Sequence, residues 1–244
     1  MNAHRIEGAV ALVTGANRGI GRALTEALLA RGARKVYATA RNPEALRALR
    51  DERLVALRLD VTDADQIRAA AEAASDVDLV FNNAGLALPG GIADEAALDR
   101  ARREMEVNYF GPLQLLRRLA PALARNGGGA VVNVDSTAGL TNVPFIPTYS
   151  ASKAALHSLT QGLRAALRAQ GIRVFGVYPG PVDTDMAKDI PMAKTPARDV
   201  ARAIVDGLVA GTEDIFPDPM AKEFGESFLK GPKALEEQLA GAGA

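Results

Sequence analysis

Short apolar runs alternate with longer amphipathic stretches along most of this 244-residue chain. A short apolar run bounded by turn residues is typical of a buried strand, and the longer stretches have helical periodicity. Strands that alternate with helices pair in parallel through right-handed crossovers, and strands that are apolar on both faces need helices on each side. The alternation therefore predicts a single α/β domain, a doubly wound parallel sheet of about seven strands with helices on both faces.

The expected strands cover residues 10–13, 36–40, 54–59, 78–81, 130–134, 173–177 and 214–216. The expected helices cover residues 19–31, 43–51, 63–75, about 95–125, 149–169 and 196–209, and a further helix is expected between 224 and 239. No linker or change of composition divides the chain, so we expect one domain over residues 1–244, in which 217–244 form a helical tail.

The composition excludes several classes of function. The chain has no Cys and only two His, His4 and His157, which argues against disulfides, iron–sulfur clusters and metal sites. Its 29 Lys and Arg residues balance 29 Asp and Glu residues, and Trp is absent, so nucleic acid is not an expected partner. No signal-peptide pattern and no 18-residue apolar run occur, so we expect no membrane contact and a cytoplasmic location.

A glycine-rich turn, T-G-A-N-R-G-I-G, covers residues 14–21 between the first expected strand and the first helix. Glycines there let the backbone approach a pyrophosphate, and the helix N-terminus supplies N–H groups and the positive end of a dipole. Any tight strand–helix turn favours Gly, so the turn alone is weak support for a dinucleotide site. A P-loop is excluded, because no Gly-Lys-Ser or Gly-Lys-Thr follows.

The second expected strand ends in Ala40-Arg41-Asn42, where a NAD-binding site usually has a carboxylate for the ribose 2′-hydroxyl. Arg41 could instead bind a 2′-phosphate, and Arg18 in the glycine turn could reach the same phosphate. The alternative is that both are solvated surface arginines. The pair favours NADP(H) over NAD(H).

Tyr149 and Lys153 are four residues apart on an expected helix, so the phenol and the ammonium share one face. A free phenol has a pKa of about 10, and neighbouring cations lower that pKa, which would let Tyr149 exchange a proton with a substrate oxygen. Ser136 lies 13 residues earlier, just after the strand at 130–134, where ligands bind in open parallel sheets. Its hydroxyl could stabilise charge on a substrate oxygen, although a turn-capping Ser is the simpler explanation when it is taken alone.

These motifs and their order resemble the short-chain dehydrogenase/reductase family, from about Gly8 to Phe216. The first turn has the family's G-x-x-x-G-x-G spacing, residues 82–85 match N-N-A-G, and residues 179–184 match P-G-x-x-x-T. Asn108 matches the helix Asn that completes a catalytic tetrad through a water relay. Asp60 and Val61 end the third strand, where the family holds the adenine.

The resemblance implies an NADP(H)-dependent carbonyl reductase or alcohol dehydrogenase that transfers hydride reversibly between nicotinamide and a ketone or aldehyde. Tyr149 would be the acid/base, Ser136 would polarise the substrate oxygen, Lys153 would bind the nicotinamide ribose, and Asn108 would support the proton relay. The expected cofactor-binding residues are Gly15, Asn17, Arg18, Gly19, Ile20, Arg41, Asn42, Asp60, Val61, Asn83, Ala84, Gly85, Tyr149, Lys153, Pro179, Gly180, Val182 and Thr184. The alternative is a non-catalytic NADP-binding regulatory protein, which would not need all four residues of the tetrad.

The residues around the expected substrate site follow the family pattern less closely. Residues 185–195 are expected to form a mobile lid over a pocket for medium-sized, mainly apolar carbonyl compounds, whose candidate contacts are Ser136, Val143, Phe145, Tyr178, Met186 and Ile190. Asp135 stands where the family often has Ser, and strand alternation is expected to turn it away from Ser136. A homodimer or homotetramer is expected through the helices at 95–125 and 149–169, although Pro217 and Pro219 make the C-terminus unlike that of the usual tetramer.

Overall fold

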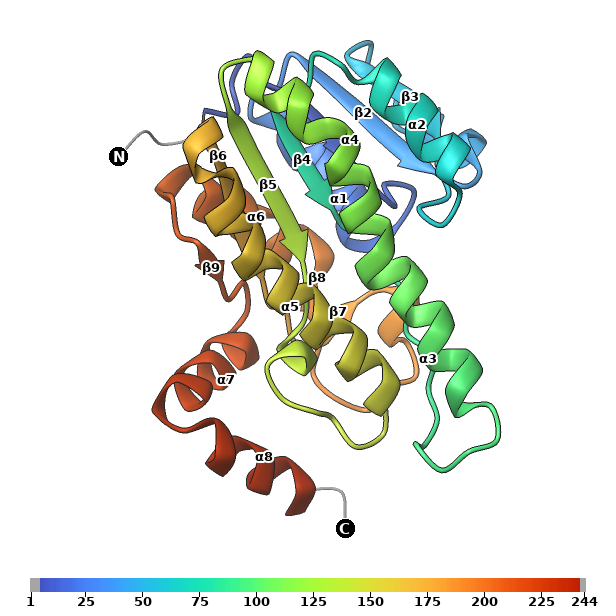
Figure 1. Cartoon of the computed structure of the whole chain (residues 1–244), viewed down its shortest axis with the longest axis vertical. Coiled ribbons are helices and arrows are strands. Elements are labelled where there is room, and N and C mark those ends of the chain that lie inside the picture. The colour runs from blue at the N-terminus through green and yellow to red at the C-terminus, as the bar shows by residue number, and fades with distance from the viewer. Residues whose placement is uncertain (1–4, 242–244) are drawn as a thin grey trace.

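A seven-stranded sheet with strand order β3-β2-β1-β4-β5-β6-β9 forms the centre of the protein, and all neighbouring strands in it are parallel (Figure 1). The computed structural model describes residues 5–241, so His4 and the last residues of the expected tail, 242–244, lie outside it. The predicted doubly wound α/β fold is confirmed. Its strands are β1 (Val10–Val13), β2 (Lys35–Ala40), β3 (Leu54–Arg58), β4 (Leu79–Asn82), β5 (Gly129–Val134), β6 (Ile172–Val177) and β9 (Asp214–Ile215).

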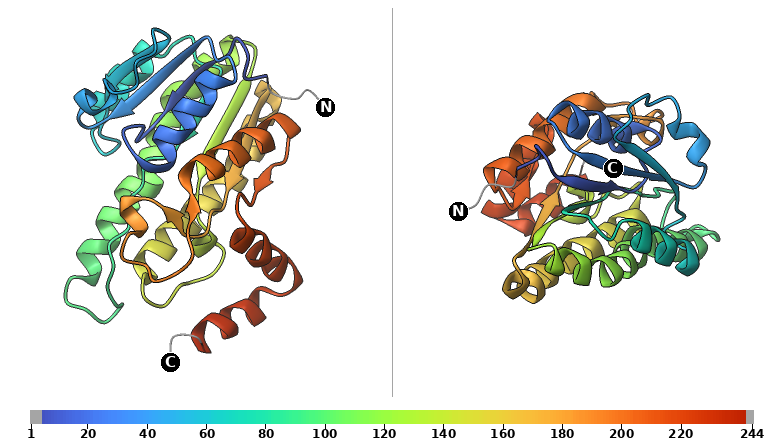
Figure 2. Two further views of the ribbon diagram at one scale, coloured as in Figure 1. Left: turned by 180° about the vertical axis from the view of Figure 1, so that it is seen from behind. Right: turned by 90° about the horizontal axis from the view of Figure 1, so that it is seen from above.

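Helices cover both faces of this sheet, and each face has its own apolar core (Figures 1 and 2). On one face lie α1 (Gly19–Ala30) and α6 (Ala197–Ala210), which bury Leu24 and Ile204 against the strands. On the other lie α2 (Ala64–Ala73), α4 (Gly111–Arg125) and α5 (Pro147–Leu167), which bury Ile67, Leu119 and Leu167. Among residues 5–241, no helix has both the length and the apolar composition needed to cross a bilayer.

Three helical segments differ from the prediction. The helix expected over 95–125 is divided into α3 (Ala97–Met105) and α4 by one π-helical turn, Glu106–Phe110. The helix expected over 43–51 is only a 3₁₀ turn, Pro43–Leu46, because Leu46 is its one buried side chain and packing stabilises helices more than propensity does. The tail forms two helices, α7 (Pro219–Lys230) and α8 (Pro232–Gly241), because Gly231 and Pro232 interrupt it.

The tail begins earlier than the apolar pattern indicates. Asp218 is buried and caps α7 by accepting a hydrogen bond from the Ala221 N–H at 2.9 Å, and Pro219 occupies the first helical position. The other oxygen of Asp218 accepts from the Gly180 N–H at 2.9 Å. This carboxylate therefore fixes the tail to the turn that follows β6.

All strands of the sheet point the same way, so the loops after β1, β4, β5 and β6 meet at one edge. In Figure 1 this is the lower edge, toward which the arrowheads of the strands point and where α3, β7 and α7 are also found. Two short strands, β7 (Val182–Asp183) and β8 (Thr195–Pro196), pair in parallel there and enclose the segment expected to be a lid. Ligands bind at this edge in open α/β sheets.

Candidate active site

The glycine-rich turn is held against the segment that follows β4. Gly15 and Gly19 have positive φ angles of 65° and 53°, and a Cβ on Gly21 would lie 2.3 Å from the Gly15 carbonyl oxygen. The Thr14 hydroxyl accepts hydrogen bonds from the N–H groups of Asn83 and the next residue, both at 2.9 Å. No side chain of the described residues caps the N-terminus of α1, which suits that end of the helix to an anion.

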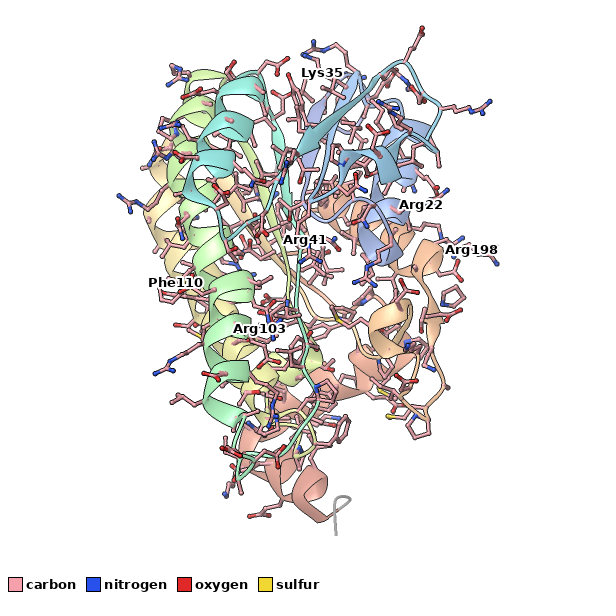
Figure 3. The ribbon with its side chains drawn as sticks, turned by 90° about the vertical axis from the view of Figure 1, so that its right-hand side faces the viewer. Arg22, Lys35, Arg41, Arg103, Phe110 and Arg198 are labelled. Atoms are coloured by element: carbon pink, nitrogen blue, oxygen red, sulfur yellow. The ribbon has the colours of Figure 1, made fainter. Side chains whose placement is uncertain are left out.

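The two arginines expected at a 2′-phosphate are in different situations. The Arg18 guanidinium donates to the Asp185 carboxylate at 2.8 Å, in an ion pair whose two side chains are both more than half exposed. Arg41 follows β2, is exposed, and lies on the face of the molecule seen in Figure 3. Asn42, next to it, accepts a hydrogen bond from the Glu44 N–H and so caps the 3₁₀ turn. An exposed ion pair contributes about 0–1 kcal/mol, so Arg18 can exchange Asp185 for a phosphate at little cost.

The residues expected around the adenine lie at the ends of β3 and β4. Asp60 accepts two hydrogen bonds from Thr62, from its N–H at 3.0 Å and its hydroxyl at 2.8 Å. Val61 is buried and packs where Gly111 begins α4, because a Cβ on that glycine would lie 3.0 Å from the Val61 side chain. Asn83 donates to the Thr14 carbonyl oxygen at 2.8 Å, which joins β4 to the glycine turn.

Asn108 lies in the π-helical turn and is almost completely buried. Its Oδ1 accepts from the Leu86 N–H and its Nδ2 donates to the Leu86 carbonyl oxygen, both at 2.8 Å. The same amide group donates to the Ser152 hydroxyl at 2.8 Å, which links the turn to α5. The side chain therefore holds the segment after β4 beside α5, and π turns inside helices often occur at functional sites.

Ser136, Tyr149 and Lys153 meet where β5 ends against α5. Ser136 follows β5, and its hydroxyl accepts from the Ala138 N–H at 3.1 Å. Lys153 is buried, its Nζ lies 5.8 Å from the centre of the Tyr149 ring, and it donates to the Val134 carbonyl oxygen at 2.8 Å. The Ser136 hydroxyl, the Tyr149 phenol and the Lys153 ammonium thus converge at the carboxyl edge of the sheet.

Burial raises the pKa of Tyr149 well above its usual value, and hydrogen bonding to Ser136 only partly opposes this. The carboxylates of Asp135 and Glu104 raise the pKa of Tyr149 further. Burial lowers the pKa of Lys153. The expectation that the ammonium gives Tyr149 a lowered pKa is therefore wrong for the protein alone, in which the phenol keeps its proton at neutral pH.

Asp135 has a closer connection with the site than the sequence suggests. Strand alternation does turn it to the α5 side of the sheet, but there it is 3% exposed and acts electrostatically on both Lys153 and Tyr149. Glu104 was not predicted either: it is fully buried in α3 and accepts from the Leu88 N–H at 2.7 Å. Glu104 lies four residues before Asn108, at a position where the helical pattern predicts burial. A charged residue at such a position is the sequence signal that could have identified it.

Most of the expected substrate contacts are accessible, but one is not. Phe145 is 56% and Met186 48% exposed, and Val143 and Ile190 are partly exposed. Tyr178 is 1% exposed, and its hydroxyl hydrogen-bonds His157 at 2.8 Å and Asp214 at 3.3 Å. Tyr178 is therefore a packing residue between β6, β9 and α5, and the expectation that it lines the pocket is wrong.

Comparison with known proteins identifies the family of the chain and supports its fold. A family model described as short chain dehydrogenase matches residues 9–195. The chain belongs to the short-chain dehydrogenase/reductase family, whose members include oxidoreductases similar to this chain.

A short-chain dehydrogenase from Burkholderia cenocepacia J2315, solved in complex with NADP, is 42% identical and has a TM-score of 0.92, covering 96% of this chain and 98% of its own. A short-chain dehydrogenase/reductase from Burkholderia phymatum, solved in complex with NAD, is 29% identical with a TM-score of 0.78, covering 88% and 91%. An uncharacterized oxidoreductase from Myxococcus xanthus is 36% identical over 227 residues, which are 86% of this chain and 88% of that protein. The two solved relatives thus hold different dinucleotides.

Proposed function

We propose that this protein is an NADP(H)-dependent carbonyl reductase or alcohol dehydrogenase, with Tyr149 as its acid/base. The observation that supports this most directly is the convergence of Ser136, Tyr149 and Lys153 at the carboxyl edge of the sheet. Asn108 connects this cluster to the segment after β4. A regulatory protein that only binds a dinucleotide would not require that arrangement.

Several features of the chain suit a dinucleotide phosphate cofactor. The tight glycine turn and the uncapped start of α1 would receive the pyrophosphate, and Arg41 and Arg18 would bind the 2′-phosphate. Lys153 would donate to the nicotinamide ribose, and the turn at Gly180 would enclose the nicotinamide end. The bound cofactor supplies or accepts the hydride.

Tyr149 and Ser136 would handle the substrate oxygen. The raised pKa of Tyr149 keeps the phenol protonated, which is the form needed to give a proton to a ketone oxygen as it gains negative charge. The Ser136 hydroxyl would donate to the same oxygen. Alcohol oxidation requires the phenolate, and the positive charge of an oxidised nicotinamide would lower the pKa of Tyr149 toward the working range.

The test is steady-state NADPH oxidation with a panel of ketones and aldehydes. We expect turnover with some members of the panel, and product alcohol in equal amount to the NADPH consumed. NADPH binding without turnover on any carbonyl compound would instead favour the regulatory protein.

The substrate is expected to be a medium-sized, mainly apolar carbonyl compound. Met186 and Phe145 expose apolar surface beside the site, and methionine adapts to varied shapes. Met186→Ser should therefore lower kcat/KM for a bulky apolar ketone roughly 5- to 20-fold, the equivalent of about 1–2 kcal/mol of lost apolar contact, and change little for a small ketone. Leu229→Ser removes an even more exposed apolar side chain from the end of α7 and serves as the control. Activity confined to highly charged substrates would contradict this pocket.

The chain is expected to form at least a dimer through α3, α4 and α5. Leu116 and Leu119 are buried within the subunit, so they offer no surface for association. Phe110, 39% exposed, and the partly exposed Leu113 do offer such surface at the start of α4, and Figure 3 shows Phe110 on the outer side of this helical layer. Light scattering at micromolar concentration should give at least twice the mass of one chain, and Phe110→Glu should shift the distribution to monomer while Leu229→Glu does not. A monomeric wild-type protein at that concentration would contradict it.

A further inference from the structure

Asp135 is a buried carboxyl group in the centre of the candidate active site. Its backbone N–H donates to the Val177 carbonyl oxygen at 2.7 Å, which fixes it at the end of β5. Within residues 5–241, neither carboxyl oxygen accepts a well-aligned hydrogen bond or is reached by solvent, and the backbone N–H of Ser136 favours the carboxylate only to a minor extent. A buried ionised carboxylate without such partners is strongly unfavourable, so a proton is the simplest way to stabilise the group.

The carboxyl group lies between Gly139 and the backbone of α5 at Lys153. A Cβ on Gly139 would be 2.7 Å from Asp135 Oδ1 and 3.0 Å from the Lys153 carbonyl oxygen, so glycine alone fits there. The same lysine directs its ammonium to Val134, the residue before Asp135. The carboxyl group and the ammonium thus approach the end of β5 from the same helix side.

Burial raises the pKa of Asp135 to about 8, because the attraction of the Lys153 ammonium and the Ser136 N–H offsets only part of the desolvation cost. Below that pH the carboxyl group is neutral and adds no charge beside Lys153 and Tyr149. Above it, the carboxylate compensates the ammonium. The net charge beside Tyr149 therefore changes across the range in which dehydrogenases work.

The charged and titratable groups around Asp135 come from three elements. Lys153 and Tyr149 interact with it from α5. Tyr178 follows β6, and its pKa is raised mainly by burial, then by Asp214 and then by Asp135. Glu104, on α3, acts on Tyr149 in the same direction as Asp135. Lys153 is the one cation among these groups. Ionised Asp135 offsets its positive charge, and this changes the electrostatic environment of the Tyr149 phenol.

We propose that Asp135 is a positioning residue that holds a proton beside Lys153 and, by releasing it, moves the pH range in which Tyr149 exchanges protons with the substrate. This rests on the proposed function of Tyr149. Asp135 does not touch the reacting atoms. Its effect is electrostatic. The ionised carboxylate raises the pH at which the Tyr149 phenol loses its proton, and this favours carbonyl reduction at higher pH.

The first test compares the pH profiles of wild type and Asp135→Asn, which mimics the protonated carboxyl group. A neighbouring charge shifts a pKa by about 1–3 units, so we expect the midpoint of kcat/KM for alcohol oxidation to move down by about one pH unit. The falling limb for carbonyl reduction should move in the same direction. Asp65→Asn, which removes the same charge from the exposed side of α2, should leave both midpoints unchanged.

The second test does not depend on activity. The pKa of Asp135 is raised in the folded state above its unfolded value of about 3.9, so ionisation destabilises the fold progressively from about pH 4 to pH 8. The Tm of Asp135→Asn minus that of wild type should increase over this window and become constant above it, whereas Asp65→Asn should give no such rise. If Asp135→Asn does not fold, Asp135→Ser, the residue common in the family, replaces it in both tests.

An unchanged pH midpoint in an active Asp135→Asn enzyme overturns the proposal, whatever the melting curves show. A Tm difference that does not change with pH overturns it as well, because Asp135 then holds no proton. Absence of turnover in the wild-type protein would instead refute the proposed function, and the melting series would still decide whether Asp135 is protonated.

Discussion

Replacing Tyr149 with phenylalanine should lower kcat for carbonyl reduction by about 10²–10⁴-fold, which is the usual contribution of a general acid. The Tyr149 phenol is buried and its pKa is raised by that burial, so it holds the proton that we expect it to give to a substrate oxygen. The ring itself is retained in Tyr149→Phe, so the packing of α5 against the turn after β5 should persist. NADPH affinity, measured by fluorescence titration, should therefore stay within a few-fold of wild type.

Tyr37→Phe is the matched control for this variant. Tyr37 is also buried, and its hydroxyl also makes a hydrogen bond, to Asp76 at 2.8 Å, but it lies on β2 away from the carboxyl edge. Loss of activity in both variants would point to a stability effect. More than roughly a tenth of wild-type activity in Tyr149→Phe would remove Tyr149 from the proton-transfer step.

Removing Arg18 and Arg41 together should lower kcat/KM for NADPH by roughly 30- to 1000-fold. Two charge-assisted contacts to a 2′-phosphate supply on the order of 2–4 kcal/mol, at about 1.4 kcal/mol per decade. NADH has no phosphate at that position, so its kcat/KM should change by no more than about two-fold. Arg18 must give up Asp185 to bind the phosphate, so Arg41 is expected to account for the larger share.

Arg47→Ala controls for the loss of one positive charge near β2, since Arg47 is exposed and paired with Glu44. Equal kcat/KM for the two cofactors in the unmodified protein would show that the arginines are ordinary surface charges. Replacing Ala40 with Asp would place a carboxylate at the end of β2, where NAD-binding sites usually have one, but it should destabilise the fold. Ala40 is 3% exposed in the core under α1, so the new carboxylate would be buried.

The fold was predictable because its signals are local. Val10–Val13 forms the buried strand that its four apolar residues indicate, and Gly15 and Gly19 adopt the positive φ angles that glycine permits. The order of the motifs also places Ser136 and Tyr149 at one edge of the sheet, since every parallel strand delivers its following loop there.

The remaining features depend on contacts between distant segments. The π turn at Asn108 cannot be read from a helical pattern, because its side chain is held by Leu86, 22 residues away. The burial of Asp135 depends on Gly139 and α5 closing over it, and strand alternation gives only its direction. The hydroxyl of Tyr178 turns to His157, 21 residues earlier, instead of toward the substrate side.

Because Asp218 has two structural roles, the two ends of α7 differ in how freely their sequences can change. The Asp218 carboxylate caps the start of α7 and also accepts a hydrogen bond from the N–H of Gly180, 38 residues away, so its identity is tied to the shape of the turn that follows β6. The exposed residues toward the end of α7, such as Leu229, make no comparable link among the described residues. Evolution could therefore reshape the outer tail to meet new surroundings while the inner end, anchored at Asp218, keeps the candidate active site unchanged.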